Sequence, residues 1–282
     1  PMRILCLYLR YGREHSSTFE RLRRWYSLNL SRERVETWII DNSLSEGTSE
    51  GVEGPFRLFP GDNSMREFSG WDRIRAAYAE EIQGFDLVHF VDDRFDVLYT
   101  KYLEHFHPTM IERVAFHPIC LGHIDSYDRE VSLKGVRSQH WIRTCFFFMS
   151  PSTLNRLGPF VSQRDEADFF DREGLFRRGS LSGQYVRYIT DWLAGVPLQG
   201  VSWHSRIGDP ALFRKKALMI LNEHALSIRL RQRGVRLMDF CWSWYRGSHG
   251  LLPSKALPGW REQVRFRSDF LKGRVPDGGL PS

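Results

Sequence analysis

The stretch FDLVHFVDDR, residues 85–94, is a short apolar run that ends in two carboxylates and a guanidinium. An apolar run of this length, bounded by charged residues, is typical of a strand that is buried on both faces. Strands of that kind occur in parallel sheets, whose crossover helices cover both sides. We therefore expect residues 87–91 to form a central strand of an α/β fold, with the acidic pair at its carboxyl end.

The preceding residues alternate between strand and helix patterns. The apolar run at residues 4–9 ends at Arg10, too soon for a signal-peptide core or a membrane span, and we expect a buried strand there. The expected order is strand 3–9, helix 17–28, strand 35–40, helix 71–82 and strand 87–91. This alternation predicts a mostly parallel, Rossmann-like sheet flanked by helices.

Polar residues follow each expected strand: Arg10-Tyr11, Asp41-Asn42 and Asp92-Asp93-Arg94. In open parallel sheets the ligand binds beyond the carboxyl ends of the strands, so these groups are expected on one rim. A strand-end aspartate accepts hydrogen bonds from a uracil-type imide or a ribose hydroxyl, which makes Asp41 a candidate for nucleotide selection. Asp-Asn-Ser is also ordinary turn chemistry, and a simple turn role is the alternative.

Further elements are expected up to Gly234, which is placed to end the last helix. They are a helix at 99–106, a strand at 113–116, a polar loop at 122–139 that borders a substrate cleft, a strand at 145–149, a helix at 150–157, a helix at 183–193, a strand at 196–203 and a helix at 210–233.

The net charge of +6 over 282 residues is unevenly distributed. Residues 211–275 hold 14 Lys/Arg against four acids, which favours an anionic partner such as a lipid head group, a diphosphate or a nucleic acid, unless the segment is a solvated helix face. The last quarter also carries the aromatic residues Trp242, Trp244, Tyr245, Trp260, Phe266 and Phe270. Such a mixture suits a membrane interface or single-stranded nucleic acid, and the third alternative is that the rings pack back on the domain.

Several common site types are missing from the sequence. The four cysteines are widely separated and form no C-x-x-C pair, which disfavours a zinc knuckle or a disulfide scaffold and fits a reducing cytoplasm. The chain contains no G-x-S-x-G elbow, no Walker A sequence and no G-x-G-x-x-G after the first expected strand. This argues against serine hydrolases, ordinary kinases and dinucleotide oxidoreductases.

Several segments resemble one known family in their order along the chain. They are WIIDNS at 38–43, FSGWD at 68–72, FDLVHFVDDR at 85–94, WIRTCFFFM at 141–149 and LGPF at 157–160. Together they resemble the GT-A fold glycosyltransferases, especially the family-2-like and rhamnan-synthesis-like enzymes of bacterial surface polysaccharide assembly. The resemblance covers roughly residues 3–205. It implies that a sugar is moved from a nucleoside-diphosphate sugar to a glycan or glycolipid acceptor.

The resemblance also implies which residues bind the donor. The implied donor-binding residues are Asp41, Asn42, Arg66, Trp71, Asp72, Asp92, Asp93 and Arg94. For Asp72 and Arg66, a helix-terminal acid and a surface arginine are the alternatives. The family's acidic triplet is altered here, because Arg94 stands at its third position.

Two interpretations of the acidic motif stay open. Asp92, Asp93 and Asp96 can support Mg or Mn, with Asp93 and His204 as the implied metal ligands. Alternatively, Arg94 stabilises the leaving diphosphate without a metal. A lone histidine such as His204 is also often structural.

Inverting sugar transfer needs a base that deprotonates the acceptor hydroxyl. By resemblance the candidate is Asp191, which is followed by an aromatic residue that can lie against a sugar ring. Other carboxylates remain as rivals: Glu166, Asp168, Asp171 and Glu223.

We expect a catalytic domain over residues 1–205, with a nucleotide-sugar half at about 1–98 and an acceptor half at about 99–205. A helical, basic and aromatic C-terminal extension, residues 206–282, is expected to pack on it. The expected protein is a cytoplasmic glycosyltransferase of lipopolysaccharide or capsule synthesis, in peripheral contact with the inner face of an anionic membrane. The alternatives are a noncatalytic nucleic-acid-binding protein and a degenerate GT-A domain that binds sugar nucleotide without turnover.

Overall fold

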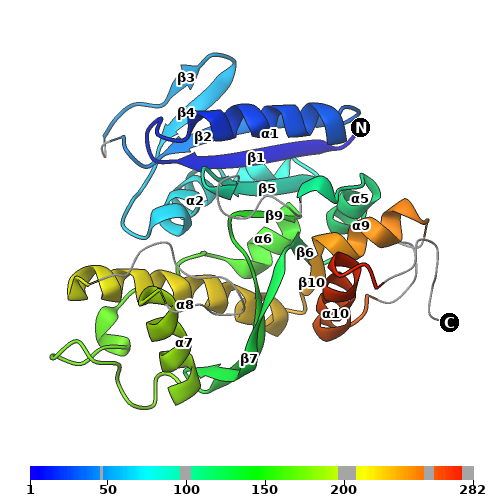
Figure 1. The fold of residues 1–282 in the computed structure, drawn as a ribbon. Coiled ribbons are helices and arrows are strands. Elements are labelled where there is room, and N and C mark those ends of the chain that lie inside the picture. Colours follow the sequence, from blue (N-terminus) through cyan, green and yellow to red (C-terminus); the bar gives the residue numbers. More distant parts are fainter. Residues whose placement is uncertain (45–46, 96–102, 196–207, 251–256, 275–282) are drawn as a thin grey trace. The chain divides into compact units, whose positions relative to one another are not determined.

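A computed structural model describes residues 1–44, 47–95, 103–195, 208–250 and 257–274 (Figure 1). The chain divides into two compact units. Unit 1 comprises Pro1–Asp125, Ile142–Phe160 and Leu230–Ser282, and unit 2 comprises Ser126–Trp141 and Val161–Arg229. Among the described residues, no helix is long and apolar enough to cross a membrane.

Unit 1 is built on an eight-stranded sheet in the order β10-β6-β9-β5-β1-β2-β4-β3. The strands are β1 (Arg3–Arg10), β2 (Arg34–Asp41), β3 (Gly51–Glu53), β4 (Phe56–Pro60), β5 (Leu87–Asp92), β6 (Ile119–Gly122), β9 (Phe146–Met149) and β10 (Arg236–Asp239). Only β3 and β9 run antiparallel to their neighbours. Helices flank this sheet, and the predicted mostly parallel α/β fold is confirmed.

The central strand β1 is buried on both faces, and its side chains alternate between two helices. Tyr8 contacts Phe19 of α1 (Ser16–Asn29), with ring centroids 4.8 Å apart. On the other face, the Leu9 side chain lies against Gly70 of α2 (Arg66–Ala77), where an added Cβ would come within 2.4 Å of it. The helix and strand patterns of the first 92 residues therefore come from one sandwich of helix, sheet and helix.

The other helices of unit 1 are α3 (Ala79–Gln83), α5 (Thr109–Phe116), α6 (Pro151–Leu157), α9 (Phe240–Ser248) and α10 (Trp260–Leu271). Aromatic rings of α9 and α10 pack against one another: Trp244 lies 5.3 Å from Phe270, and Tyr245 lies 4.8 Å from Phe266. Trp242 and Tyr245 are both 4% exposed. Of the three alternatives for these aromatic residues, packing on the domain is the one observed.

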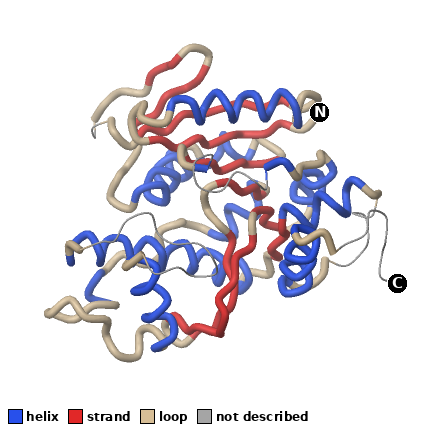
Figure 2. The backbone as a smooth tube through the Cα atoms, viewed as in Figure 1, coloured by secondary structure: helices blue, strands red, loops and turns tan. Residues whose placement is uncertain are grey.

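Unit 2 contains most of the hairpin of β7 (Ile124–Leu133) and β8 (Val136–Ile142), helix α7 (Gly183–Leu193) and most of helix α8 (Pro210–Gln232). The colours of Figure 2 distinguish the long hairpin from these helices. Asn222 of α8 accepts hydrogen bonds from the backbone N–H groups of Ser162 and Gln163 at 2.8 and 2.9 Å. This buried amide ties the loop after residue 160 to the helix.

Three sequence expectations are wrong in detail. The strand expected at 113–116 is the end of helix α5, because Met110, Ile111 and Val114 form one buried helical face. The loop expected at 122–139 is the β7–β8 hairpin, whose turn residues Lys134 and Gly135 both have positive φ, 48° and 80°. The helix expected at 71–82 starts earlier, at Arg66, and breaks at Tyr78.

Most of the remaining expected elements are confirmed within about two residues. The expected strands at 3–9, 35–40, 87–91 and 145–149 and the expected helices at 17–28, 150–157, 183–193 and 210–233 all form. Strand β10, in the segment expected to be helical, adds an unforeseen parallel strand beside β6. The strand expected at 196–203 and the first half of the helix expected at 99–106 lie outside the described residues, and the described half, residues 103–106, is not α-helical.

Candidate functional site

The strand order of unit 1 changes direction beside β1. The chain passes from β1 to β2 and β4 on one side, whereas β5 pairs with β1 on the other side. In open α/β sheets, ligands bind at such a switch point, outside the carboxyl ends of the strands. Here the two ends are joined directly, because the Tyr11 N–H donates to Oδ2 of Asp93 at 3.1 Å. The segments that follow β1 and β5 therefore form one rim.

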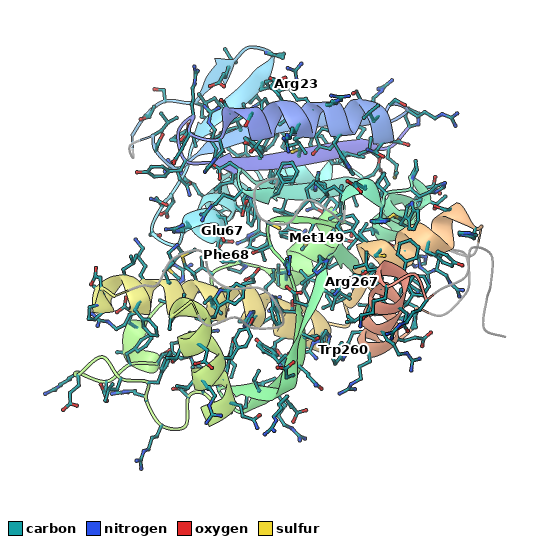
Figure 3. All side chains as sticks on the ribbon, viewed as in Figure 1. Arg23, Glu67, Phe68, Met149, Trp260 and Arg267 are labelled. Carbon is teal, nitrogen blue, oxygen red and sulfur yellow. The ribbon has the colours of Figure 1, made fainter. Side chains whose placement is uncertain are left out.

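Asp92 lies at this rim in an electrostatic environment that opposes its ionisation. Burial raises its pKa to about 8, with further contributions from the negative charges of Glu67 and Asp93, while Arg94 acts in the opposite direction. The backbone N–H of Arg94 donates to Oδ1 of Asp92 at 2.8 Å. Figure 3 labels Glu67 and Phe68 at the start of α2. A bound cation would relieve the repulsion among these carboxylates.

Asp93 is 6% exposed, and its pKa is also raised, chiefly by burial. The hydrogen bond from Tyr11 and the positive charge of Arg94 counteract that shift. Two adjacent carboxylates that are both costly to ionise are typical of sites that take up a proton or a metal ion.

Arg66 and Arg94 bring positive charge to the same rim. Burial and the charge of Arg94 lower the pKa of Arg66, and Asp92 and Asp93 act against this shift. Arg66 also has φ 50°, a left-handed conformation that is uncommon for a residue with a side chain and occurs often at functional sites. Two guanidinium groups that repel each other gain stability when an anion such as a diphosphate binds between them.

Asp41 follows the neighbouring strand β2 and is engaged by the chain itself. Its Oδ2 accepts from Nε of Arg10 at 2.8 Å, and its Oδ1 accepts from the N–H groups of Gly12 and Ser43, both at 2.9 Å. Burial raises its pKa, but the hydrogen bonds from Ser43, Gly12 and Arg10 together hold the pKa below its usual value. In this arrangement, Asp41 organises the turn that carries Tyr11.

Asn42 is wedged between two glycines. A Cβ at Gly61 would lie 1.9 Å from Oδ1 of Asn42, and one at Gly70 would lie 2.8 Å from it. The Asn42 amide donates to the carbonyl of Arg66 at 2.9 Å, so it sets the first turn of α2. These glycines are required for close approach, which gives the Gly70 of the FSGWD motif a structural reason.

Two other expected donor residues have structural roles. Trp71 is fully buried among Phe90, Phe147 and Phe160, and its indole N–H donates to the Leu7 carbonyl at 3.3 Å. It offers no surface to a donor, and its assignment as a donor-binding residue is corrected to a core role. Asp72 accepts from the Phe160 N–H at 2.7 Å and thereby holds the segment after α6 against α2.

The implied metal ligands divide between described and undescribed residues. His204 and Asp96 lie outside the described residues. Among the residues that the structure describes, no group of three or more His, Cys, Asp or Glu side chains is arranged to hold a metal ion. The part of the site that is described, Asp92 and Asp93, has the oxygen ligands that Mg and Mn prefer, with a diphosphate and water completing such sites.

Sequence reasoning missed a second charged group on this rim. Asp125 accepts two hydrogen bonds from Arg143, one of them Nη2 to Oδ1 at 3.2 Å, and lies 3.3 Å from Nε2 of His123. Burial opposes ionisation of Asp125, but Arg143 and His123 hold its pKa far below the usual range. The backbone joins this group to the acidic pair, because the Asp92 N–H donates to the Cys145 carbonyl at 3.1 Å. Because the strand was expected at residues 113–116 and β6 spans Ile119–Gly122, His123 and Asp125 were not recognised as residues that follow a strand end.

Tyr11 is a further rim residue whose role the sequence did not specify. Its side chain is 56% exposed, although its backbone is fixed by Asp93. An exposed aromatic ring at a switch point offers a face on which a nucleobase can stack.

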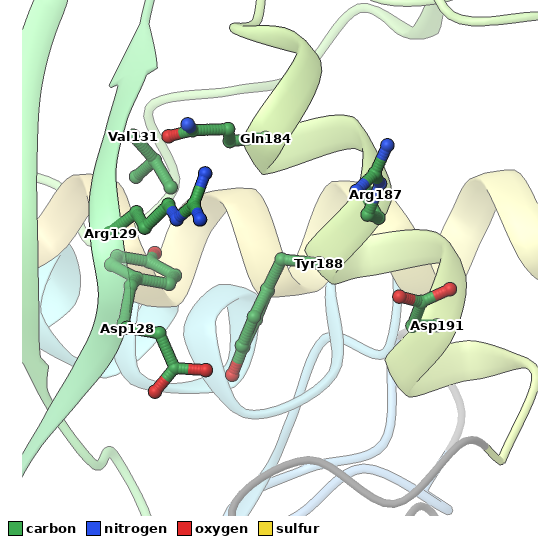
Figure 4. A pocket seen from close by; sticks show the side chains of 8 residues that line it. Asp128, Arg129, Val131, Gln184, Arg187, Tyr188 and Asp191 are labelled. Carbon is green, nitrogen blue, oxygen red and sulfur yellow. The ribbon is translucent and has the colours of Figure 1, made fainter.

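In unit 2, Asp191 of α7 lines a pocket of about 340 Å³ between β7 and α7 (Figure 4). Three of its four rivals have contacts of their own: Glu166 pairs with Arg214 at 3.1 Å, and Asp168 pairs with Lys134 at 2.7 Å. Asp171 accepts from the N–H groups of two residues in its own turn.

Comparisons with known proteins are sparse. No protein-family model matches the chain, and no curated protein matches it in sequence. Among solved structures, the galactosyltransferase LgtC, determined in complex with donor and acceptor sugar analogues, aligns over 92% of this chain and 99% of its own at 11% identity and a TM-score of 0.30. Because this structural similarity is so weak, any proposal about function has to rest on the residues of the chain itself.

Proposed function

We propose that this protein is a glycosyltransferase that uses a nucleoside-diphosphate sugar. The observation that carries the proposal is the meeting of Asp92, Asp93, Arg94 and Arg66 at the switch point between β1 and β5. A group of two carboxylates and two guanidiniums at that place matches a diphosphate with or without a cation.

On the donor side, Arg66 and Arg94 bind the diphosphate, and the guanidinium charge offsets the charge that develops as the diphosphate leaves. Tyr11 stacks on the nucleobase, while Asp41 and Asn42 fix the backbone around it. Asp92 and Asp93 would hold a divalent cation, Mg or Mn, which would supply charge neutralisation at the diphosphate. The undescribed residues Asp96 and His204 remain candidates for completing that site.

On the acceptor side, Asp191 is the proposed base. In the proposed transfer, the acceptor oxygen attacks the anomeric carbon, its proton passes to a carboxylate base, and the bond from the anomeric carbon to the diphosphate oxygen breaks. This step balances without a redox partner. Its support is the position of Asp191 in a pocket, whereas Glu166 and Asp168 are ion-paired.

From the family resemblance, we also propose a biological setting for the reaction. In this proposal, the reaction belongs to lipopolysaccharide or capsule synthesis on the cytoplasmic face of the membrane, with a glycan or lipid-linked acceptor. Peripheral contact with anionic lipid is supported by the exposed basic residues of α10 and the residues after it, Arg261, Arg265, Lys272 and Arg274.

The test is thermal protection and donor hydrolysis with a panel of UDP-, GDP-, dTDP- and CMP-sugars, each with and without Mg or Mn. We expect one nucleotide class to raise the melting temperature, and Asp93→Asn to abolish that rise. The exposed-face variant Glu20→Gln is the control, because Glu20 is exposed and pairs with Arg23 on α1 at 3.2 Å. No response to any activated sugar contradicts the proposal, and binding without turnover supports the degenerate alternative.

Nucleic-acid binding is less well supported. The rings that suggested base stacking, Trp242, Tyr245 and Phe266 among them, pack against one another in unit 1. Salt-sensitive oligonucleotide binding that Asp92→Ala strengthens would favour this second function.

A further inference from the structure

The pocket of unit 2 lies between one strand and one helix. Tyr127, Asp128 and Arg129 of β7 line one side, and Gln184, Tyr188 and Asp191 of α7 line the other (Figure 4). Its volume of about 340 Å³ lies within the usual range of small-molecule sites, about 300–1,000 Å³. All of these residues belong to unit 2, so the pocket does not depend on how the two units are placed.

The floor of the pocket is Tyr127, which belongs to a hydrogen-bonded group of buried rings. The hydroxyl groups of Tyr127 and Tyr185 both reach Nδ1 of His224, the latter at 2.6 Å. Tyr127 and His224 are each 4% exposed, and burial holds the pKa of Tyr127 well above its usual value, so its phenol stays neutral. Trp141 packs behind this group, with its ring 4.3 Å from that of His224. A pocket with such a floor is preformed.

Tyr188 forms a wall that stands perpendicular to this floor. Its ring centroid lies 4.8 Å from that of Tyr127, with an interplanar angle of 84°. Figure 4 shows the Tyr188 ring extending from α7 toward β7, between the side chains of Asp128 and Asp191. The electron-rich face of an aromatic ring attracts the C–H face of a sugar ring, and flanking carboxylates accept from its hydroxyl groups.

The charge of the pocket selects among ligand classes. Asp128 and Asp191 are balanced by Arg129 and Arg187, which also line it, so the pocket is neutral as a whole. Two carboxylates disfavour an anion, and two guanidiniums disfavour a cation. Sugar hydroxyl groups donate and accept at once, and they match this mixture of acceptors and donors, including the Gln184 amide.

We propose that the pocket between β7 and α7 binds an uncharged pyranose unit of the acceptor glycan. The word acceptor rests on the proposed function, whereas sugar binding itself requires no donor and no turnover. Tyr188 provides the stacking face, Asp128 and Asp191 accept from hydroxyl groups, and Arg129 with Gln184 donates to them.

The experiment is saturation-transfer NMR on the full chain without nucleotide, using the methyl pyranosides of glucose, galactose, mannose and rhamnose. Methyl glucuronide, glucosamine and adenosine serve as anionic, cationic and non-pyranose competitors. We expect at least one uncharged pyranoside to bind more tightly than all three competitors. Tyr188→Ala should weaken it about tenfold, and Asp128→Asn or Asp191→Asn about fivefold. Tyr188→Phe should retain binding, because it keeps the ring.

Matched controls come from the same two elements. Thr190→Ala on α7 and Glu130→Gln on β7 change exposed residues that do not line the pocket, and neither should alter binding. The proposal is overturned if no pyranoside gives a signal, if a charged sugar or adenosine binds best, or if Tyr188→Ala and Asp191→Asn, shown to be folded by their melting curves, both bind as tightly as the unaltered chain.

Failure here is distinguishable from failure of the proposed function. Nucleotide-sugar protection without any pyranoside binding overturns this inference alone. Pyranoside binding that survives Asp93→Asn, in a chain that responds to no nucleotide sugar, leaves a sugar-binding site and contradicts the transferase.

Discussion

The ends of β2 and β5 each carry an aspartate on the same rim, and the two are held in opposite ways. Asp41 accepts from Arg10, Gly12 and Ser43, and its pKa is lowered. Burial and neighbouring carboxylates raise the pKa of Asp92 to about 8. A carboxylate satisfied by its own chain stabilises the fold, whereas one left in a costly ionised state stabilises a ligand. In the proposed function, the β2 end is thus the support of the site, and the β5 end is the part that binds.

The largest effect should come from Asp41→Ala. The variant leaves Arg10 buried with only Glu53 as its ionic partner, and removing one member of a buried ion pair costs about 3 kcal/mol or more. Urea denaturation at pH 7 measures this loss in the free energy of unfolding. Glu20→Gln, in an exposed pair, should change it by less than about 0.5 kcal/mol. An equal effect of both variants would remove the distinction drawn for the β2 end.

Gly61→Ala should destabilise the same support by about 2 kcal/mol, because its Cβ would overlap Oδ1 of Asn42 and approach the Asn42 backbone at 3.0 Å. The matched control is Gly51→Ala in β3, where an added Cβ meets no atom within 4 Å among the described residues. Thermal melting of both variants tests the prediction. If the Gly61 variant is as stable as the Gly51 variant, the Asn42 side chain can move away from the added Cβ without a cost in stability.

The contributions of Asp92 and Asp41 to the free energy of unfolding should depend on pH with opposite signs. Since the folded pKa of Asp92 is raised from 3.8 to about 8, its favourable contribution is complete below pH 3.8 and is lost as pH rises to 8. Relative to the unaltered chain, Asp92→Asn should therefore gain at least about 1 kcal/mol of stability between pH 4 and pH 8.

Asp41 and Glu53 should act in the reverse direction. The pKa of Glu53 is lowered from 4.5 to about 2, first by its hydrogen bonds to Arg10, so its contribution is lost as pH falls from 4.5 to 2. Denaturation of wild type, Asp92→Asn and Glu53→Gln across pH 2 to 9 measures both pH-dependent changes in stability, that of Asp92 and that of Glu53. A pH-independent difference between Asp92→Asn and the wild type would contradict the raised pKa.

The smallest effect should be that of Tyr11→Ala, at the point where the two regions meet. Its side chain is 56% exposed, so stability should change by less than about 0.5 kcal/mol. Affinity for the matching nucleoside diphosphate should fall about tenfold through loss of stacking, while Tyr11→Phe should retain it. Titration calorimetry reports this, and unchanged affinity in Tyr11→Ala would exclude the ring from the donor site.

The rim could be predicted in outline because strand-end residues follow from period and polarity alone. Asp41, Asp92 and Asp93 were found in this way, and all three lie where the register of β2, β1 and β5 puts them. The role of Trp71 could not be predicted in this way, because the sequence pattern is the same for an aromatic residue that faces a ligand and for one that faces the core. The Asp125 group was missed because the strand before it was placed six residues too early.

The amino-acid sequence by itself determined the central strands β1, β2, β5 and β9 of the mostly parallel sheet and the clustering of polar residues at strand ends, because hydrophobic periodicity and strand polarity are local properties. Only the tertiary structure decided which carboxylates are satisfied and which are exposed to repulsion. That difference depends on Arg10, Gly12 and Glu67, which reach the aspartates from other segments. The burial and mutual charge of distant side chains, which no single stretch of sequence encodes, separate the supporting aspartate from the binding one.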